Sequence, residues 1–296
     1  MSYRLYRPMT AQAASEPALW RLVAGVVTAL AIMALWIGLI VGIATIWLGG
    51  DLVRGFGQVV GSGGRTPAGA ITQLMLVAGL GFGTYVALRM WQRGRGQSLS
   101  GPAARLLRHF AIAVVVAFIA LSLLAFLSVG DGEFLQRNLS FETWLVWLPA
   151  AVIAVAVQTG AEELFFRGYL QTQLAARWKS PWFWIGLPAL FFGAVHFVPG
   201  LPGANSWILV GYATLFGILA GDLTARTGSL GAAWGFHFAN NFMGIAIIST
   251  QGPISGLGLW IREEGITEEI AVSPALLLDV GVLFVIWWMI RRVLTI

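Results

Sequence analysis

The chain has 296 residues, of which 58% are hydrophobic and only 10% charged, and it contains no cysteine. A soluble domain usually carries about 25% charged residues, so this composition indicates a protein that lies in lipid. The lack of cysteine excludes disulfides, thiolate metal ligands and a cysteine nucleophile. The net charge of +5 does not indicate nucleic-acid binding, because the basic residues flank apolar runs instead of forming one stripe.

Eight apolar runs approach or exceed the length of about 20 residues that a membrane-spanning helix needs. They are separated by turns and polar loops and lie, in chain order, at 20–48, 71–91, 109–129, 144–166, 181–198, 206–225, 229–249 and 274–290. A polar segment, 1–19, precedes the first run, which is too long for the apolar part of a signal peptide. The sequence therefore predicts an all-α, polytopic membrane protein with a single transmembrane domain over 20–296.

The basic residues are unequally divided between the two sides of the predicted bundle. With a cytoplasmic N-terminus, thirteen Lys and Arg residues fall in cytoplasmic segments and four on the other side, with Arg167 left out of the count. Cytoplasmic loops of membrane proteins carry an excess of Lys and Arg. Both termini and the 1–19 segment are therefore predicted to be cytoplasmic.

Charged side chains inside the apolar spans mark candidate functional residues, because each costs about 2.5 kcal/mol or more at the helix centre. Glu163 and Arg167 are spaced i, i+4 in the order that favours an ion pair. Glu162 points about 100° away from Glu163 on a helix. The spacing predicts that Arg167 holds Glu163 and leaves Glu162 available for chemistry. The alternative is that the three residues mark the cytoplasmic end of the helix.

Two histidines lie inside later spans. His196 is near the end of the fifth run, where a histidine is often a core residue bonded to a carbonyl group. His237 and Asn241 are spaced i, i+4 in the seventh run and so share a helix face. Polar residues of this kind also join membrane helices to one another.

The depth of these residues in the membrane gives a consistency test. With a rise of 1.5 Å per residue, Glu162, His196, His237 and Asn241 reach a similar level only if the fourth helix continues to about residue 177. We therefore predict that the fourth helix is long, that it begins within 143–149, and that the paired Arg167 lies within the membrane.

A carboxylate and imidazoles around a water-accessible cavity suit hydrolysis. Glu162 could be the general base for a water molecule, helped by His196, while His237 and Asn241 donate hydrogen bonds to the oxyanion. Alternatively, Glu162, His196, His237 and Asn241 could bind a divalent metal such as zinc, which would activate the water. The residues alone leave both mechanisms open.

The motifs Glu-Glu-x-x-x-Arg, Phe-x-x-x-His and His-x-x-x-Asn, carried on successive spans, resemble those of the CPBP family. These are the CAAX-protease and bacteriocin-processing (Abi) proteins, which include the type II CAAX prenyl endopeptidases. All three motifs match without substitution over about 160–241, at Glu162, Glu163, Arg167, Phe192, His196, His237 and Asn241.

The resemblance implies an intramembrane endopeptidase of the glutamate or metallo type, with its catalytic core at about 142–249. In such a protein Glu162 and His196 would activate water, and His237 and Asn241 would form the oxyanion site. The cavity would open to the cytoplasm, and the partners would be a peptide or membrane-protein substrate and the lipid bilayer. The Arg-rich, nearly Lys-free sequence favours a bacterial source and a multi-pass protein of the inner (plasma) membrane.

Two other classes of function use similar residues. A proton-coupled transporter also places Glu, His and Arg in the membrane, but it would favour an internal repeat and broken helices, which the sequence does not show. A non-catalytic bacteriocin-immunity or scaffold protein would keep the fold and act by binding. Loss of activity on replacement of Glu162 separates an enzyme from such a scaffold.

Overall fold

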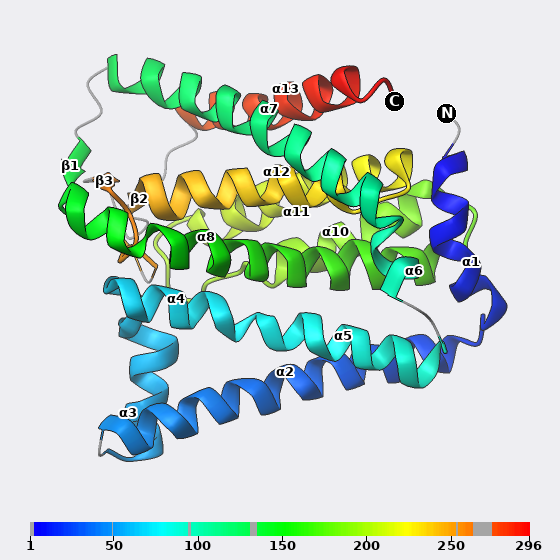
Figure 1. The fold of residues 1–296 in the computed structure, drawn as a ribbon, viewed down its shortest axis with the longest axis horizontal. Coiled ribbons are helices and arrows are strands. Elements are labelled where there is room, and N and C mark those ends of the chain that lie inside the picture. Colours follow the sequence, from blue (N-terminus) through cyan, green and yellow to red (C-terminus); the bar gives the residue numbers. More distant parts are fainter. Residues whose placement is uncertain (1–2, 49, 94–95, 131–134, 253, 263–273) are drawn as a thin grey trace.

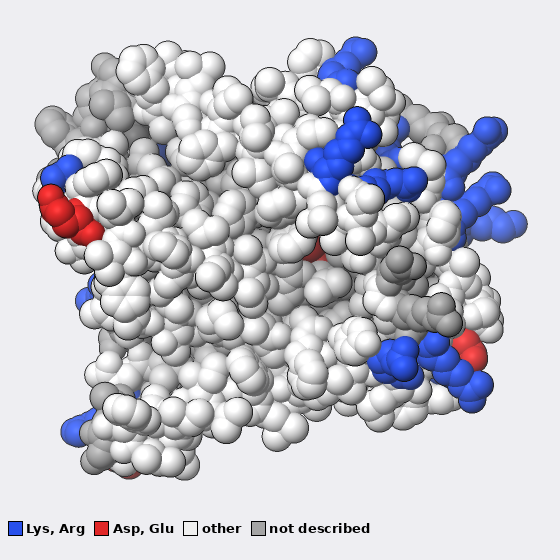
Figure 2. Space-filling view, viewed as in Figure 1, with Lys and Arg blue, Asp and Glu red and all other residues white. Residues whose placement is uncertain are grey.

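A computed structural model describes residues 3–48, 50–93, 96–130, 135–252, 254–262 and 274–296. The long helices lie side by side, and the two ends of the chain lie at the same end of the bundle (Figure 1). On the face drawn in Figure 2, Lys and Arg side chains gather at that same end, and the middle of the face is almost free of charge. This basic end is the side that the distribution of Lys and Arg predicts to be cytoplasmic.

Each of the eight apolar runs forms a helix or a pair of joined helices. These are α2 (Leu19–Leu48), α4 (Pro67–Leu76) with α5 (Ala78–Trp91), α7 (Ala103–Gly130), α8 (Phe141–Glu163), α10 (Pro181–Ala194), α11 (Asn205–Thr227), α12 (Gly231–Phe242) and α13 (Pro274–Val293). Shorter helices are η1 (Arg4–Tyr6), α1 (Arg7–Ser15), α3 (Leu52–Phe56), η2 (Gly57–Ser62), η3 (Gly63–Arg65) and α6 (Gly96–Ser100).

Five helical stretches of the described chain are long and apolar enough to cross a membrane, and α10 is apolar but only 14 residues long. The prediction of an all-α, polytopic membrane protein is therefore confirmed, while five of the eight expected spans meet this criterion. The predicted fifth span, 181–198, is too long, because α10 ends at Ala194. Pro199 follows shortly after, and the residue before a proline is disfavoured in a helix.

The prediction of a long fourth helix is confirmed. After α8, the chain continues without a break through a π-helical segment, η4 (Leu164–Leu170), into α9 (Gln171–Ala175). The whole stretch has 35 residues, which span about 50 Å at the usual helical rise. It begins slightly earlier than expected, where the Ser140 side chain accepts a hydrogen bond from the backbone N–H of Thr143.

Helix α12 lies against α7 at two of its glycines. A Cβ atom at Gly231 would collide with the carbonyl oxygen of Leu106, and one at Gly235 would collide with that of Phe110. The absence of side chains therefore lets the two backbones approach closely, as small residues four positions apart do between membrane helices. After α12 the chain forms another π-helical segment, η5 (Met243–Ile247).

A small sheet at the end opposite the termini was not predicted. Strand β3 (Trp260–Arg262) lies between β1 (Leu135–Arg137), with which it is antiparallel, and β2 (Ile248–Thr250), with which it is parallel. Three residues are too few to give an alternating pattern of apolar and polar side chains, which is why the sequence does not reveal these strands.

Candidate functional site

The candidate site lies between the end of α8 and the middle of α12. Glu162 and Glu163 are the last two residues of α8, and Arg167 is in η4 directly after it. His237 and Asn241 are one turn apart in α12. Helix α8 continues directly into η4 and α12 into η5, and such π-helical segments are frequent at functional sites.

Glu163, Arg167 and His237 form a buried triad. The Glu163 Oε1 atom lies 2.9 Å from a guanidinium nitrogen of Arg167 and 2.8 Å from Nδ1 of His237. The Arg167 and Glu163 side chains are only 1% and 0% exposed. The predicted Glu163–Arg167 pair is therefore present, and Glu163 has a second role that was not predicted, because it also orients His237.

This contact determines which imidazole nitrogen carries a proton. A carboxylate only accepts hydrogen bonds, so Nδ1 of His237 must be the donor to Glu163. The other ring nitrogen, Nε2, then faces Glu162, whose Oε2 atom lies 3.5 Å away. The hydrogen bond from Nδ1 of His237 to Glu163 therefore fixes the imidazole so that Nε2 is the ring nitrogen that faces Glu162.

Three phenylalanine rings surround the Arg167 guanidinium. Its central carbon lies 4.4 Å from the ring centre of Phe192, 5.8 Å from that of Phe216 and 5.9 Å from that of Phe166. The rings of Phe192 and Phe216 also lie 5.7 and 4.9 Å from the His237 ring. Aromatic faces stabilise a desolvated cation, so the three rings hold Arg167 in place, and two of them also pack against His237.

Glu162 is separate from this cluster of charges, as expected from its position on the helix. Its side chain is 14% exposed, and its Oε2 atom is buried and makes no hydrogen bond within the described structure. The 3.5 Å between this atom and His237 exceeds the length of a direct hydrogen bond. Glu163 is therefore the carboxylate that is bonded to Arg167 and His237, and Glu162 lies beside them without such a bond.

Asn241 is held by a residue that the sequence analysis missed. Its side-chain Nδ2 donates a hydrogen bond of 3.0 Å to Oε1 of the buried Gln158, and its Oδ1 accepts one of 3.4 Å from Asn240. Gln158 lies four residues before Glu162, so the two share a face of α8. That spacing is the signal by which Gln158 could have been found.

His196 is placed apart from the other predicted residues. It lies just after the C-cap of α10, and its Nδ1 is 2.7 Å from the carbonyl oxygen of Phe192. Its ring lies 4.7 Å from that of Phe192, which also contacts the ring of His237. Across the described residues, His196 makes no hydrogen bond or ion pair with Glu162, His237 or Asn241.

Comparison with known proteins identifies this region. Residues 141–243 match the family model described as type II CAAX prenyl endopeptidase Rce1-like. These residues form an Rce1-like domain. The predicted resemblance to the type II CAAX prenyl endopeptidases is therefore confirmed for this part of the chain, which begins with α8 and contains every candidate residue described above.

A relative of the Rce1-like domain is an uncharacterized protein, YyaK, of Bacillus subtilis (strain 168). It is 35% identical over 147 residues, which are 49% of this chain and 48% of the relative. The chain thus spans about half the length of the curated relative that it matches. No solved structure matches the chain.

The Rce1-like domain does not gather the predicted metal ligands into one group. No cluster of three or more His, Cys, Asp or Glu side chains that could hold a metal ion occurs among the described residues. Glu162 and His237 face each other, Asn241 is bonded to Gln158, and His196 is bonded to a backbone carbonyl. A catalytic zinc site uses three protein ligands, and Glu162 and His237 are the two predicted ligands that face each other.

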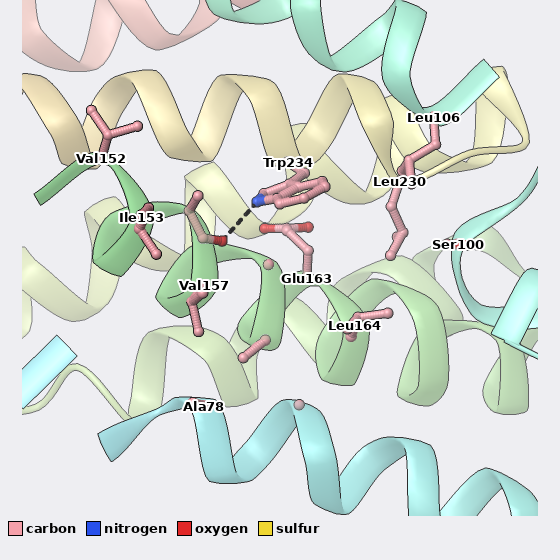
Figure 3. A pocket seen from close by; sticks show the side chains of 14 residues that line it. Ala78, Ser100, Leu106, Val152, Ile153, Val157, Glu163, Leu164, Leu230 and Trp234 are labelled. Carbon is pink, nitrogen blue, oxygen red and sulfur yellow. Dashed lines mark hydrogen bonds between the residues drawn. The ribbon is translucent and has the colours of Figure 1, made fainter. Parts of the chain in front are cut away.

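A cavity of about 540 Å³, the central cavity, adjoins the triad and is lined by residues of α5, α6, α7, α8, η4 and α12. Its walls are almost entirely apolar, and Glu163 and Trp234 are among its lining residues (Figure 3). The Trp234 indole is fixed by a hydrogen bond of 3.1 Å to the carbonyl of Ala156. Figure 2 shows a hollow near the middle of the apolar face with an acidic group inside it. The helical bundle thus combines an apolar cavity with buried ionisable groups.

Proposed function

We propose that this protein is an intramembrane endopeptidase that hydrolyses a peptide bond with water activated at Glu162 and His237. One observation carries the proposal: Oε2 of Glu162 faces Nε2 of His237 at 3.5 Å, while Glu163 and Arg167 hold the other side of the imidazole. A water molecule contacting both Glu162 and His237 would be oriented for attack on a carbonyl carbon. The membership of residues 141–243 in a peptidase family supports this reading.

In the proposed reaction Glu162 is the general base. It accepts a proton from the water as the water oxygen bonds to the carbonyl carbon of the substrate, and it later gives that proton to the leaving amine. Asn241 has two N–H groups and donates one to Gln158, so the second can donate to the oxyanion. Proton transfer by a positioned carboxyl group contributes roughly 10²–10⁴-fold to the rate.

The metal-assisted alternative makes a distinct prediction. Glu162 and His237 provide two ligands close together, fewer than the three of a catalytic zinc site, so no step is assigned to a metal. Metal analysis of the purified protein tests this. A stoichiometric metal that is needed for cleavage, and that is lost in Glu162→Gln, would replace the metal-free mechanism.

The substrate is proposed to be a peptide or membrane protein that enters from the lipid phase. The central cavity supports this, because its apolar walls would accept a lipid-like or hydrophobic group beside the triad. We place the protein in the bacterial inner membrane with the basic end in the cytoplasm. The supporting observation is the concentration of Arg residues at the end of the bundle that carries both termini.

The decisive experiment compares Glu162→Gln with Glu142→Gln in the full chain reconstituted into liposomes. Both residues lie on α8, but Glu142 is exposed in the first turn of that helix. With quenched fluorescent peptides, free and lipid-modified, we expect Glu162→Gln to lower kcat by about 10²-fold or more and Glu142→Gln to leave it unchanged. Folded wild-type protein that cleaves none of the peptides, or full activity of Glu162→Gln, would contradict the proposal.

A further inference from the structure

A second cavity, the end cavity, lies at the basic end of the bundle between the N-terminal segment and helices α10, α11 and α13. Its volume is about 340 Å³, and it shares no lining residue with the central cavity. Its walls combine apolar side chains with one acidic and two basic residues, Asp222, Arg226 and Arg291. Nothing in the proposed hydrolysis uses these residues.

The Asp222 carboxylate accepts hydrogen bonds from three neighbouring side chains. Its carboxylate oxygens lie 2.7 and 2.9 Å from Nε of Arg226 and accept hydrogen bonds from the Tyr3 hydroxyl at 2.9 Å and the Trp287 indole at 3.0 Å. Burial, and next the Asp222 carboxylate, raise the pKa of Tyr3 to about 12, so its hydroxyl remains a donor at neutral pH. The negative charge of Asp222 is therefore balanced by Arg226.

Arg291 is the cation of the end cavity that has no balancing carboxylate. Its guanidinium lies 4.4 Å from the ring centre of Trp287, and its Nε atom is buried and has no hydrogen-bond partner within the described structure. Within the described chain it also forms no ion pair. Because a buried N–H group without a partner costs free energy, this position favours an anion that accepts a hydrogen bond.

The rest of the end cavity has apolar walls and open space beside α10. Ile218 and Leu219 of α11 line one wall, and on α10 a Cβ atom at Gly186 would meet no other atom within 4 Å. Trp182 at its rim is 85% exposed. Tryptophan is enriched where a membrane protein passes the headgroup level of the bilayer, so we expect the cavity to lie at the depth of lipid headgroups.

We propose that the end cavity binds an anionic phospholipid, with its phosphate on Arg291 and an acyl chain along Ile218 and Leu219. A soluble phosphate would use the cation but would leave the apolar walls exposed, and a zwitterionic lipid would bring its own positive group to a cavity whose net charge is already positive. Basic pockets between membrane helices on the cytoplasmic side are suited to anionic headgroups.

The experiment measures lipid binding to the full chain by native mass spectrometry, using phosphatidylglycerol and phosphatidylcholine. The test variant is Arg291→Gln, and the matched control is Arg292→Gln, because Arg292 is the adjacent residue, is exposed and lies instead over Trp288 at 5.4 Å. We expect the wild type to prefer phosphatidylglycerol. Arg291→Gln should weaken this binding roughly fivefold, the effect of one basic side chain near an anionic headgroup, and Arg292→Gln should not.

Arg291→Lys keeps the charge and should retain most of the binding, which gives a second readout if the glutamine variant unfolds. Equal losses in Arg291→Gln and Arg292→Gln would show that general surface charge is responsible and would overturn the proposal. Equal binding of the two lipids would do the same. Displacement of phosphatidylglycerol by millimolar inorganic phosphate would assign the cavity to a soluble anion instead.

Discussion

At the scale of single residues, the surroundings of Arg167 require both the charge and the planar shape of its guanidinium. It lies among three phenylalanine rings, and it shares the Oε1 atom of Glu163 with His237. A guanidinium is planar and weakly hydrated, so it can stack on rings while it donates to a carboxylate, whereas a lysine ammonium is a compact and strongly hydrated charge. The identity of the cation, and not only its charge, should therefore matter.

We predict that Arg167→Lys destabilises the protein by about 2 kcal/mol, the value of a desolvated cation–π contact. It should also lower kcat, because the carboxylate that orients His237 loses its fixed partner. Thermal unfolding in detergent, together with peptide cleavage, measures both effects. The control is Arg108→Lys, at an exposed position on α7. If Arg167→Lys unfolds at the wild-type temperature, the rings do not hold the guanidinium in the way described.

The residue scale also shows what the sequence could predict. Glu163 and Arg167 lie on one helix, where spacing alone fixes which side chains meet. The contacts of His237 with Glu163 and of Asn241 with Gln158 join α12 to α8, and they depend on how each helix is rotated about its axis. Sequence spacing places Gln158 on the same face of α8 as Glu162, but it does not give that rotation, so the hydrogen bond between Gln158 and Asn241 was missed.

The position of His196 also could not be predicted from the sequence, because it depends on where helix α10 ends. Its predicted depth assumed that the fifth span is helical to 198, but α10 ends at Ala194 and its C-cap is Val195. His196 then turns back to the carbonyl of Phe192 instead of continuing along a helix face. Helix ends are set by local hydrogen bonds that composition does not reveal.

At the scale of elements, the approach of α12 to α7 positions the site, because α12 carries His237. A Cβ atom at Gly235 would collide with the backbone carbonyl of Phe110, which cannot move away as a flexible side chain could. Gly235→Ala should therefore push α12 away from α7. We predict a destabilisation of about 1–3 kcal/mol, the usual cost of overpacking, and a loss of cleavage.

The matched control for this prediction is Gly244→Ala in η5, where an added Cβ atom would meet no other atom within 4 Å. That variant should unfold at or slightly above the wild-type temperature, since alanine is favoured over glycine within a helix. Unfolding temperatures of the two variants in the same detergent measure the difference. Equal temperatures would mean that α7 and α12 can separate without cost.

At the scale of the whole molecule, the fold has two chemically different ends. Both termini lie at the end where Arg and Lys gather, and the opposite end carries the small sheet of β1, β3 and β2 (Figures 1 and 2). The composition was sufficient to predict this polarity, because the distribution of basic residues follows orientation in the membrane. It could not predict the sheet, whose strands are three residues long.

The orientation can be measured with single introduced cysteines, because the natural chain contains none and so gives no background signal. Ser15 at the end of α1 and Thr295 near the C-terminus are exposed at the basic end, and Gln136 is exposed in β1 at the other end. If the basic end is cytoplasmic, a membrane-impermeant maleimide added to intact spheroplasts should label Gln136→Cys. It should leave Ser15→Cys and Thr295→Cys unlabelled until the membrane is permeabilised.

Labelling of Ser15→Cys in intact spheroplasts would show the opposite orientation. It would also place the end cavity, with Arg291, in the outer leaflet, so the same measurement decides from which leaflet an anionic phospholipid could reach it.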